Sequence, residues 1–194
     1  MARPREFDID SALESAMQTF WAKGYEATSV DDLCESTGLG RSSLYAAFGD
    51  KRQLYLRALD RYEDAAATRV ATALAGPRPI RKSIAAFLDR IIDDIVSRLG
   101  RRGCFIGNCA AELSRGDREA ADQVRRSLAR VEKVFCEALT RARDRGEIDA
   151  KSDVIALSRH FTAGIQGLRL VGKANPDREV LEDIAKMMLR ALDV

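Results

Sequence analysis

Apolar residues recur at helical spacing along most of the chain. Between Ile9 and Trp21 they stand at i, i+3, i+4, i+7, i+8, i+11 and i+12, on one face of an amphipathic helix that Gly24 ends. The same period predicts eight more helices, over about 30–36, 41–47, 51–73, 80–99, 105–113, 117–145, 153–171 and 177–192. No stretch alternates β-branched and polar residues as a strand does. The sequence therefore predicts an all-α fold with about nine helices.

The N-terminal part of this pattern differs from the rest because its helices are short. Gly38-Leu39-Gly40 separates the second and third helices, and Asp50 is placed to cap the long helix that follows. Two short helices joined by a glycine-containing turn are typical of a helix-turn-helix. We therefore assign residues 1–52 to a helix-turn-helix DNA-binding domain and residues 53–194 to a helical ligand-binding and dimerisation domain.

The third helix carries the side chains that suit a DNA groove. The N-terminal residues of a recognition helix face the base edges, and here they are Gly40, Arg41, Ser42 and Ser43. An arginine reads guanine through two hydrogen bonds, and serines reach bases or phosphates. Tyr45 is expected to point its hydroxyl at a phosphate. Leu44 and Phe48 are expected to anchor the helix from behind.

Composition limits the other possibilities. The chain has 194 residues, of which 46% are hydrophobic and 32% are charged, as in globular proteins. No apolar run approaches the roughly 20 residues of a membrane span, and residues 1–9 have no apolar signal core, so we expect a cytoplasmic protein without membrane contact. With four cysteines, one histidine and no CxxC, the sequence predicts reduced thiols, no metal site and no cofactor.

The net charge does not favour nucleic acid. The whole chain carries +2, and residues 1–53 hold six bases and nine acids, a balance of −3. A DNA-binding surface in this segment requires that its bases gather on one side. Arg3 and Arg5 form either a basic arm that reaches toward DNA or an ordinary solvated terminus.

These features together resemble the tetracycline-repressor (TetR/AcrR) family. The resemblance spans about residues 8–58. It lies in Gly24-Tyr25, Thr28-Ser29-Val30, Gly38-Leu39-Gly40, Leu44-Tyr45, Phe48 and Asp50-Lys51-Arg52. It implies a three-helix DNA-binding head, a helical body that holds an inducer, and a homodimer built on the last two helices. It also implies DNA contacts from Arg41, Ser42, Ser43, Tyr45 and Lys51, and a phosphate contact from Thr28 or Ser29.

The body offers candidates for an inducer pocket. Such a pocket needs apolar walls with a few polar groups, and the candidates are Phe87, Ile91, Phe105, Asn108, Glu112, Phe135, Phe161 and Ile165. Ordinary core packing explains each of them as well.

Cys104 is a candidate sensor of electrophiles or oxidants. It resembles a cysteine at the start of the sixth helix in part of the same family. A helix N-terminus and the neighbouring Arg101 and Arg102 both favour a thiolate. Cys109, five residues on, is a possible resolving partner. The alternative is that both are small buried hydrophobic residues.

A dimer interface is expected on the last two helices. The candidates are Leu157, Phe161, Leu168, Ile184, Met188 and Leu192. The function that these observations favour is a ligand- or electrophile-responsive regulator, a repressor that a small-molecule inducer releases from a palindromic operator. A helical adaptor that does not touch DNA is the alternative. No nucleophile–base pair, paired carboxylates or phosphate loop supports an enzyme.

Overall fold

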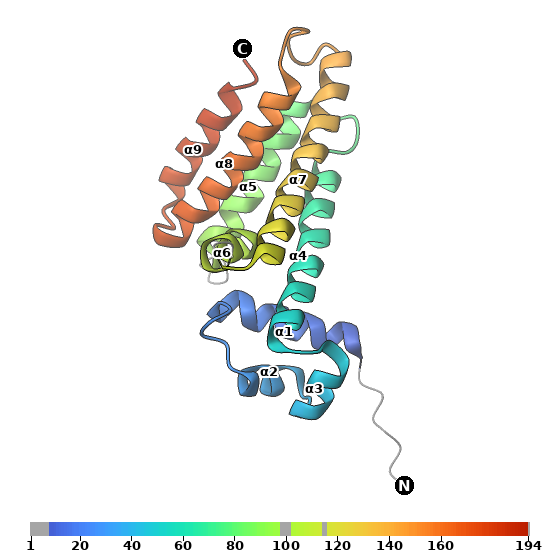
Figure 1. Ribbon diagram of the computed structural model, residues 1–194. Helices are drawn as coiled ribbons and strands as arrows, with labels where there is room; N and C mark the ends of the chain where they lie inside the picture. Colours follow the sequence, from blue (N-terminus) through green and yellow to red (C-terminus); the bar gives the residue numbers. More distant parts are fainter. Residues whose placement is uncertain (1–7, 98–101, 114–115, 194) are drawn as a thin grey trace.

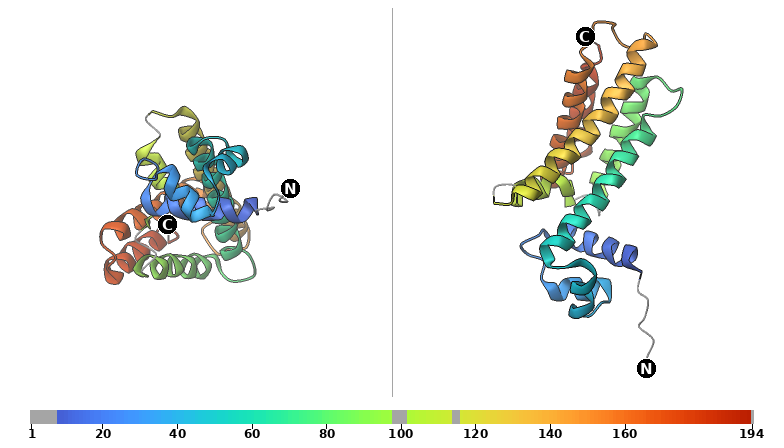
Figure 2. Two further views of the ribbon diagram at one scale, coloured as in Figure 1. Left: turned by 90° about the horizontal axis from the view of Figure 1, so that it is seen from below. Right: turned by 45° about the vertical axis from the view of Figure 1, so that its right-hand side comes forward.

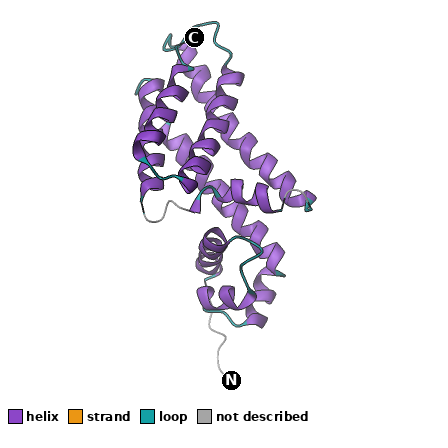
Figure 3. Cartoon of the chain, turned by 90° about the vertical axis from the view of Figure 1, so that its left-hand side faces the viewer, coloured by secondary structure: helices purple, strands orange, loops and turns teal. Residues whose placement is uncertain are grey.

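The fold of the chain is all-helical in the computed structural model, which describes residues 8–97, 102–113 and 116–193 (Figures 1 and 3). The helices in these ranges are α1 (Ile9–Lys23), α2 (Val30–Thr37), α3 (Arg41–Phe48), α4 (Lys51–Ala73), α5 (Ile80–Val96), α6 (Phe105–Glu112), α7 (Arg118–Asp144), α8 (Val154–Ala174) and α9 (Arg178–Arg190). The predicted fold class and helix order are confirmed. The arginines at positions 3, 5 and 101 lie outside the described residues.

Helices α1 to α3 form a small head at one end of the molecule, and α4 runs from this head into the body (Figures 1 and 2). Local signals fix the head. Ser29 and Asp32 form a capping box at the start of α2, and Gly38 ends α2 with φ 71°. The Asp50 carboxylate caps α4 by accepting from the Gln53 backbone N–H at 2.8 Å.

Helices α5 and α7 pack against the upper part of α4, and α8 and α9 pack in turn on α5 and α7 to complete the body. Two glycines let helices approach closely. A Cβ at Gly172 would stand 2.4 Å from Ile95 of α5, and one at Gly164 would stand 2.5 Å from Met188 of α9. No helix among the described residues is long and apolar enough to cross a membrane.

The buried residues fall into two clusters, and the division between them lies beyond residue 52. We call them the junction core and the body core. The junction core joins α1–α3 to the lower part of α4, to α6 and to the start of α7, whereas the body core joins the upper end of α4 to α5, α7, α8 and α9. The head therefore shares its core with α6 and with the first turns of α7. The boundary predicted between residues 52 and 53 stays a prediction, and it does not coincide with a break in packing.

Candidate DNA-binding surface and its contacts with the body

The leading turn of α3 is open to solvent. Gly40, Arg41, Ser42 and Ser43 are all exposed, while Leu44 behind them is buried in the junction core. Tyr45 is 41% exposed on the same helix. A helix held from behind by Leu44 and Phe48, with its N-terminal turn free, has the geometry that a recognition helix needs.

Of the two residues that precede α2, Thr28 is buried and Ser29 is exposed. Thr28 is 1% exposed, and its hydroxyl donates a 2.5 Å hydrogen bond to the Gly24 carbonyl. The predicted phosphate contact from Thr28 is therefore corrected: its hydroxyl joins the end of α1 to the start of α2. Ser29 is exposed, and as N-cap it stands beside the N-terminal backbone of α2, where an anion is favoured.

Lys51 extends the basic surface beside α3. Its ammonium lies 4.4 Å from the centre of the Tyr25 ring, a cation–π contact that holds the side chain in place. Tyr25 in turn packs edge-on against Tyr55 of α4, with ring centres 5.0 Å apart. Aromatic packing thus fixes the position of the Lys51 ammonium, and its predicted DNA contact stays a prediction.

Several acids of the head are engaged by partners within the molecule. Asp32 accepts from the Lys23 ammonium at 2.6 Å, and this bond, with those from Ser29, lowers the pKa of the Asp32 carboxyl to about 2. Asp31 pairs with Arg41 at 2.8 Å on the exposed face. Arg61 of α4 holds the Glu14 carboxylate at 2.7 Å. Two of these partners, Lys23 and Arg41, are bases of the head itself, so these pairs neutralise acids and bases of the head together.

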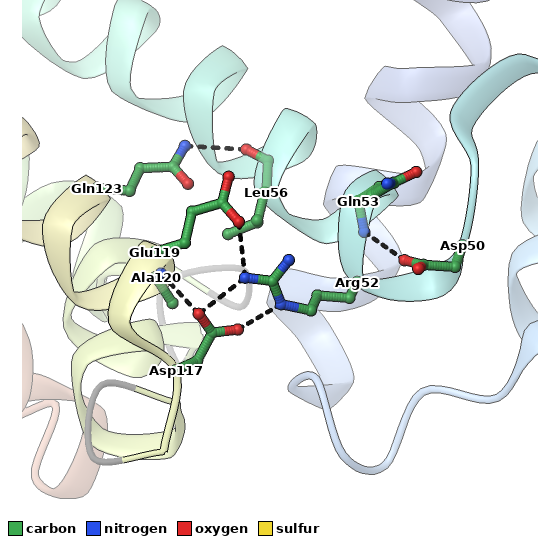
Figure 4. A network of polar contacts seen from close by, with 8 residues as sticks. All are labelled: Asp50, Arg52, Gln53, Leu56, Asp117, Glu119, Ala120 and Gln123. Atoms are coloured by element: carbon green, nitrogen blue, oxygen red, sulfur yellow. Dashed lines mark hydrogen bonds and ion pairs between the residues drawn. The ribbon is translucent and has the colours of Figure 1, made fainter.

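Arg52 joins the base of α4 to the start of α7 (Figure 4). Its Nε and Nη2 donate to the two Asp117 oxygens at 2.5 and 2.8 Å, and Nη2 also donates to Glu119 at 2.7 Å. The contact lowers the pKa of the Asp117 carboxyl to about 2, with the Arg52 bonds as the main cause. In the same network, Gln123 of α7 donates to the Leu56 carbonyl at 2.9 Å. These bonds hold the base of α4 against α7.

Helix α6 contacts the head through backbone groups. The Glu112 carboxylate accepts from the Tyr25 N–H at 2.8 Å, and the Trp21 indole N–H donates to the Gly103 carbonyl at 3.2 Å. Phe105 lies edge-on to both Tyr55 and Tyr62, at 5.2 and 5.7 Å. Local sequence patterns do not predict these contacts, because each joins residues more than 40 positions apart.

The predicted inducer-pocket residues occupy several different places. Phe87 and Ile91 line a cavity between α4 and α5. Phe105 is part of the junction core, and Glu112 contacts the head. Asn108 accepts from the Lys173 ammonium at 3.1 Å. The remaining three are packed in the body core: Phe135, Phe161 and Ile165. The residues are therefore not brought to one cavity, and ligand contact stays a prediction for each.

Cys104 is the N-cap of α6 and is 8% exposed. The Tyr62 hydroxyl lies 3.9 Å from its sulfur, and the Arg102 guanidinium donates instead to Gln18 at 2.7 Å. Cys109 is fully buried, and burial raises the pKa of its thiol to about 11, which opposes a resolving thiolate. The sensor role of Cys104 stays a prediction.

Most of the residues predicted to form the dimer interface are buried inside the protomer instead. Phe161, Leu168, Met188 and Leu192 belong to the body core of the protomer, because their stripe faces inward. Leu157 and Ile184 are partly buried against that core. The large apolar side chains exposed on these two helices are others: Ile155, Leu170, Val171, Val180 and Met187.

Comparison with known proteins connects this geometry to a family. The family model of bacterial regulatory proteins, tetR family, matches residues 12–58, and that of the tetracyclin repressor-like C-terminal domain matches residues 80–188. The HTH-type transcriptional repressor ComR of Escherichia coli is 34% identical over 97% of this chain and 90% of its own length.

The chain belongs to the tetR family of bacterial regulatory proteins. The uncharacterized HTH-type transcriptional regulator YezE of Bacillus subtilis is 31% identical over the full length of both chains. Among solved structures, a cysteine-substituted TetR family transcriptional regulator CifR, complexed with 26-base-pair operator DNA, matches with a TM-score of 0.87 and 29% identity, over 98% of this chain and all of that one. This tetR-family chain is a transcriptional regulator with a helix-turn-helix head, as its sequence indicates.

Proposed function

We propose that the protein is a repressor that binds a palindromic operator as a homodimer and releases it when a small-molecule inducer binds the body. The observation that carries the proposal is the exposed leading turn of α3, where Arg41, Ser42 and Ser43 project from a helix whose other face is buried. A regulator of this kind acts on chromosomal DNA, so we place it in the cytoplasm. The relative ComR is a repressor by name, which supports repression rather than activation.

The dimer is proposed on the outer faces of α8 and α9. Leu170 is 70% exposed and Met187 is 59% exposed, and monomeric surfaces seldom gather such side chains. Three residues before Leu170 on α8, the exposed Gly167 has no neighbour that would obstruct a Cβ, which leaves room for a helix of a second copy. A two-fold axis at this interface presents two heads on one side of the dimer. A palindromic operator requires this, because its two half-sites lie about 34 Å, one helical turn, or a multiple of it apart.

A binding assay on the DNA upstream of the protein's own gene tests the proposal. We expect a sequence-specific complex whose affinity falls steeply with salt, because phosphate contacts release counterions. Arg41→Ala should lose preference at one base pair, at a cost of about 1–3 kcal/mol, while Lys51→Ala should weaken all sequences alike and reduce the salt slope by about one.

Arg141→Ala is the matched control, because this arginine is exposed on α7, outside the head and outside the proposed dimer faces. It should bind the same DNA as wild type does. Binding that ignores sequence, or an Arg41→Ala protein indistinguishable from the control, would refute the proposal and favour the helical adaptor.

A further inference from the structure

A cavity of about 220 Å³ opens where α4, α5 and α8 meet. It lies on the side of the body where α4 and α5 run next to each other (Figure 2, right). A second hollow of about 580 Å³ continues from it along α4 and α5, and the two share Phe87 and Arg90 in their walls. Together they form one groove, which we call the α4–α5 groove.

The α4–α5 groove is lined by arginines. Arg69 comes from α4, Arg90 from α5 and Arg169 from α8, and Arg78 borders the outer hollow. Asp94 is the one acid among the residues that line the two hollows in the described part of the chain. A chain of net charge +2 thus concentrates positive charge at this opening.

Within the residues that the structure describes, Arg69, Arg90 and Arg169 form no ion pairs, whereas nine other arginines do. Guanidinium groups bind carboxylates and phosphates through paired, charge-assisted hydrogen bonds, so unpaired arginines around one cavity suit an anion.

The wall between the arginines is apolar. Ile91 is 2% exposed and forms the floor, and the partly buried Phe87 ring stands at the passage between the two hollows. The hydroxyls of Thr68 and Thr72 border the same cavity. Apolar walls with a few convergent polar groups are typical of small-molecule sites.

We propose that the α4–α5 groove binds an amphipathic organic anion. The carboxylate or phosphate head group pairs with Arg69, Arg90 and Arg169, and the apolar chain lies along Phe87 and Ile91. This inference rests on the proposed function in one respect only: the anion is then the inducer that releases the operator.

Arg69 connects the groove to the head. Its guanidinium lies 5.7 Å from the centre of the Tyr62 ring, and Tyr62 packs edge-on against Trp21 of α1 and Phe105 of α6. An anion that draws the Arg69 guanidinium into the groove removes it from the Tyr62 ring, which packs between α1 of the head and α6. Anion binding thereby favours a different position of the head. The anion lowers the affinity for the operator, and the operator lowers the affinity for the anion by the same factor.

Calorimetry with three eight-carbon probes on the full-length protein tests the site. Octanoate and octyl phosphate carry the anion, and octanol is the neutral probe. We expect saturable binding of at least one anionic probe, about tenfold or more tighter than that of octanol, because one charge-assisted contact is worth about tenfold in affinity. The tighter anion identifies the head group, carboxylate or phosphate.

Arg90→Gln and Arg169→Gln should each weaken the anionic probe about tenfold without changing octanol binding. Arg141→Gln, an exposed arginine of α7 outside the groove, is the control and should bind as wild type does. Equal affinity for octanol and both anions, no saturable anion binding, or glutamine variants that match the control would overturn the site.

Operator binding without probe is measured in parallel to separate the two proposals. Loss of operator affinity in saturating anion supports the inducer role, and unchanged operator affinity overturns that role. A protein that binds the anion through these arginines but never binds DNA would refute the proposed function and leave the groove assignment standing.

Discussion

The head and the body of this protein bury apolar residues equally well, but they leave different surfaces. The head exposes a turn of small and hydrogen-bonding side chains on α3, with Leu44 and Phe48 fixed beneath it. The body exposes single large apolar residues on α8 and α9 and unpaired arginines around the α4–α5 groove. The head surface therefore suits a duplex, and the body surfaces suit a second copy and a small anion.

The comparison also shows where the two regions are joined. Phe105 of α6 and the Arg52 contacts of α4 connect the head to the body, so the junction core is shared between them. We therefore expect a signal in the body to reach the head through this shared core.

Truncation of Phe105 should have the largest effect. Phe105→Ala removes a fully buried ring from the junction core and should lower the free energy of unfolding by about 3–5 kcal/mol. Hydrogen exchange of the amides in α1–α3 should rise with it, because these helices share that core.

Phe135→Ala is the matched control, since Phe135 is equally buried but lies in the body core. It should destabilise the body by a similar amount while head amides exchange more slowly than in Phe105→Ala. If the amides of α1–α3 exchange at the same rate in both variants, the head and α6 do not share a core.

Glu63 carries the buried carboxyl of the junction. It is 4% exposed on α4, its Oε1 has no hydrogen-bond partner in the described chain, and burial, with nearby Asp60, raises its pKa to about 7. Because the folded pKa exceeds the unfolded one, stability should fall as pH rises from about 4.5 to 7. Glu63→Gln should therefore stabilise the protein above pH 7, by roughly 1–3 kcal/mol.

Chemical denaturation at pH 5 and pH 8 measures this effect. The gain from Glu63→Gln should be larger at pH 8. Glu35→Gln, at an exposed site on α2, is the control and should change little at either pH. A Glu63→Gln protein with the same stability as wild type at pH 8 would show that the carboxyl is accommodated in its charged form.

Arg52→Gln should cost less, because its ion pair with Asp117 is partly exposed. We expect a loss of about 1 kcal/mol near neutral pH. Since the folded pKa of Asp117 is depressed to about 2, this contribution is present above the unfolded value near 3.8 and disappears as pH falls toward 2. Denaturation of wild type and variant across acid pH should show the two curves converging, and a constant offset would argue against the pair.

The smallest expected effect concerns the exposed pair of Asp31 and Arg41. Asp31→Asn frees the guanidinium and removes a negative charge beside the duplex, so operator affinity should rise roughly two- to fivefold. Glu35→Gln removes an acid from the same helix without freeing Arg41 and should give a smaller gain. Equal gains would mean that only net charge matters.

The sequence predicts the fold and the head well because both depend on local signals. Helical periodicity, the Asp50 cap and the glycine break between α2 and α3 act within a few residues of one another, and all are confirmed. The family resemblance implies a phosphate contact from Thr28 or Ser29, and only packing shows that the Thr28 hydroxyl turns inward.

The body is harder to predict because each apolar stripe on a helix serves either the core or an interface. Phe161 and Met188 fit a dimer pattern but pack inside the protomer, while Leu170 and Met187 are left outside. The groove arginines come from three helices, and Arg69 and Arg169 are separated by 100 positions. No local pattern brings such residues together.

The central claim is that two copies of the α3 leading turn meet one duplex together. Hydroxyl-radical footprinting of the wild-type protein on the DNA upstream of its gene tests this most directly. We predict two protected patches of equal extent, related by a two-fold axis and about 34 Å or a multiple of it apart. A single unsymmetrical patch, or no protection at concentrations where the protein is fully folded, would contradict it.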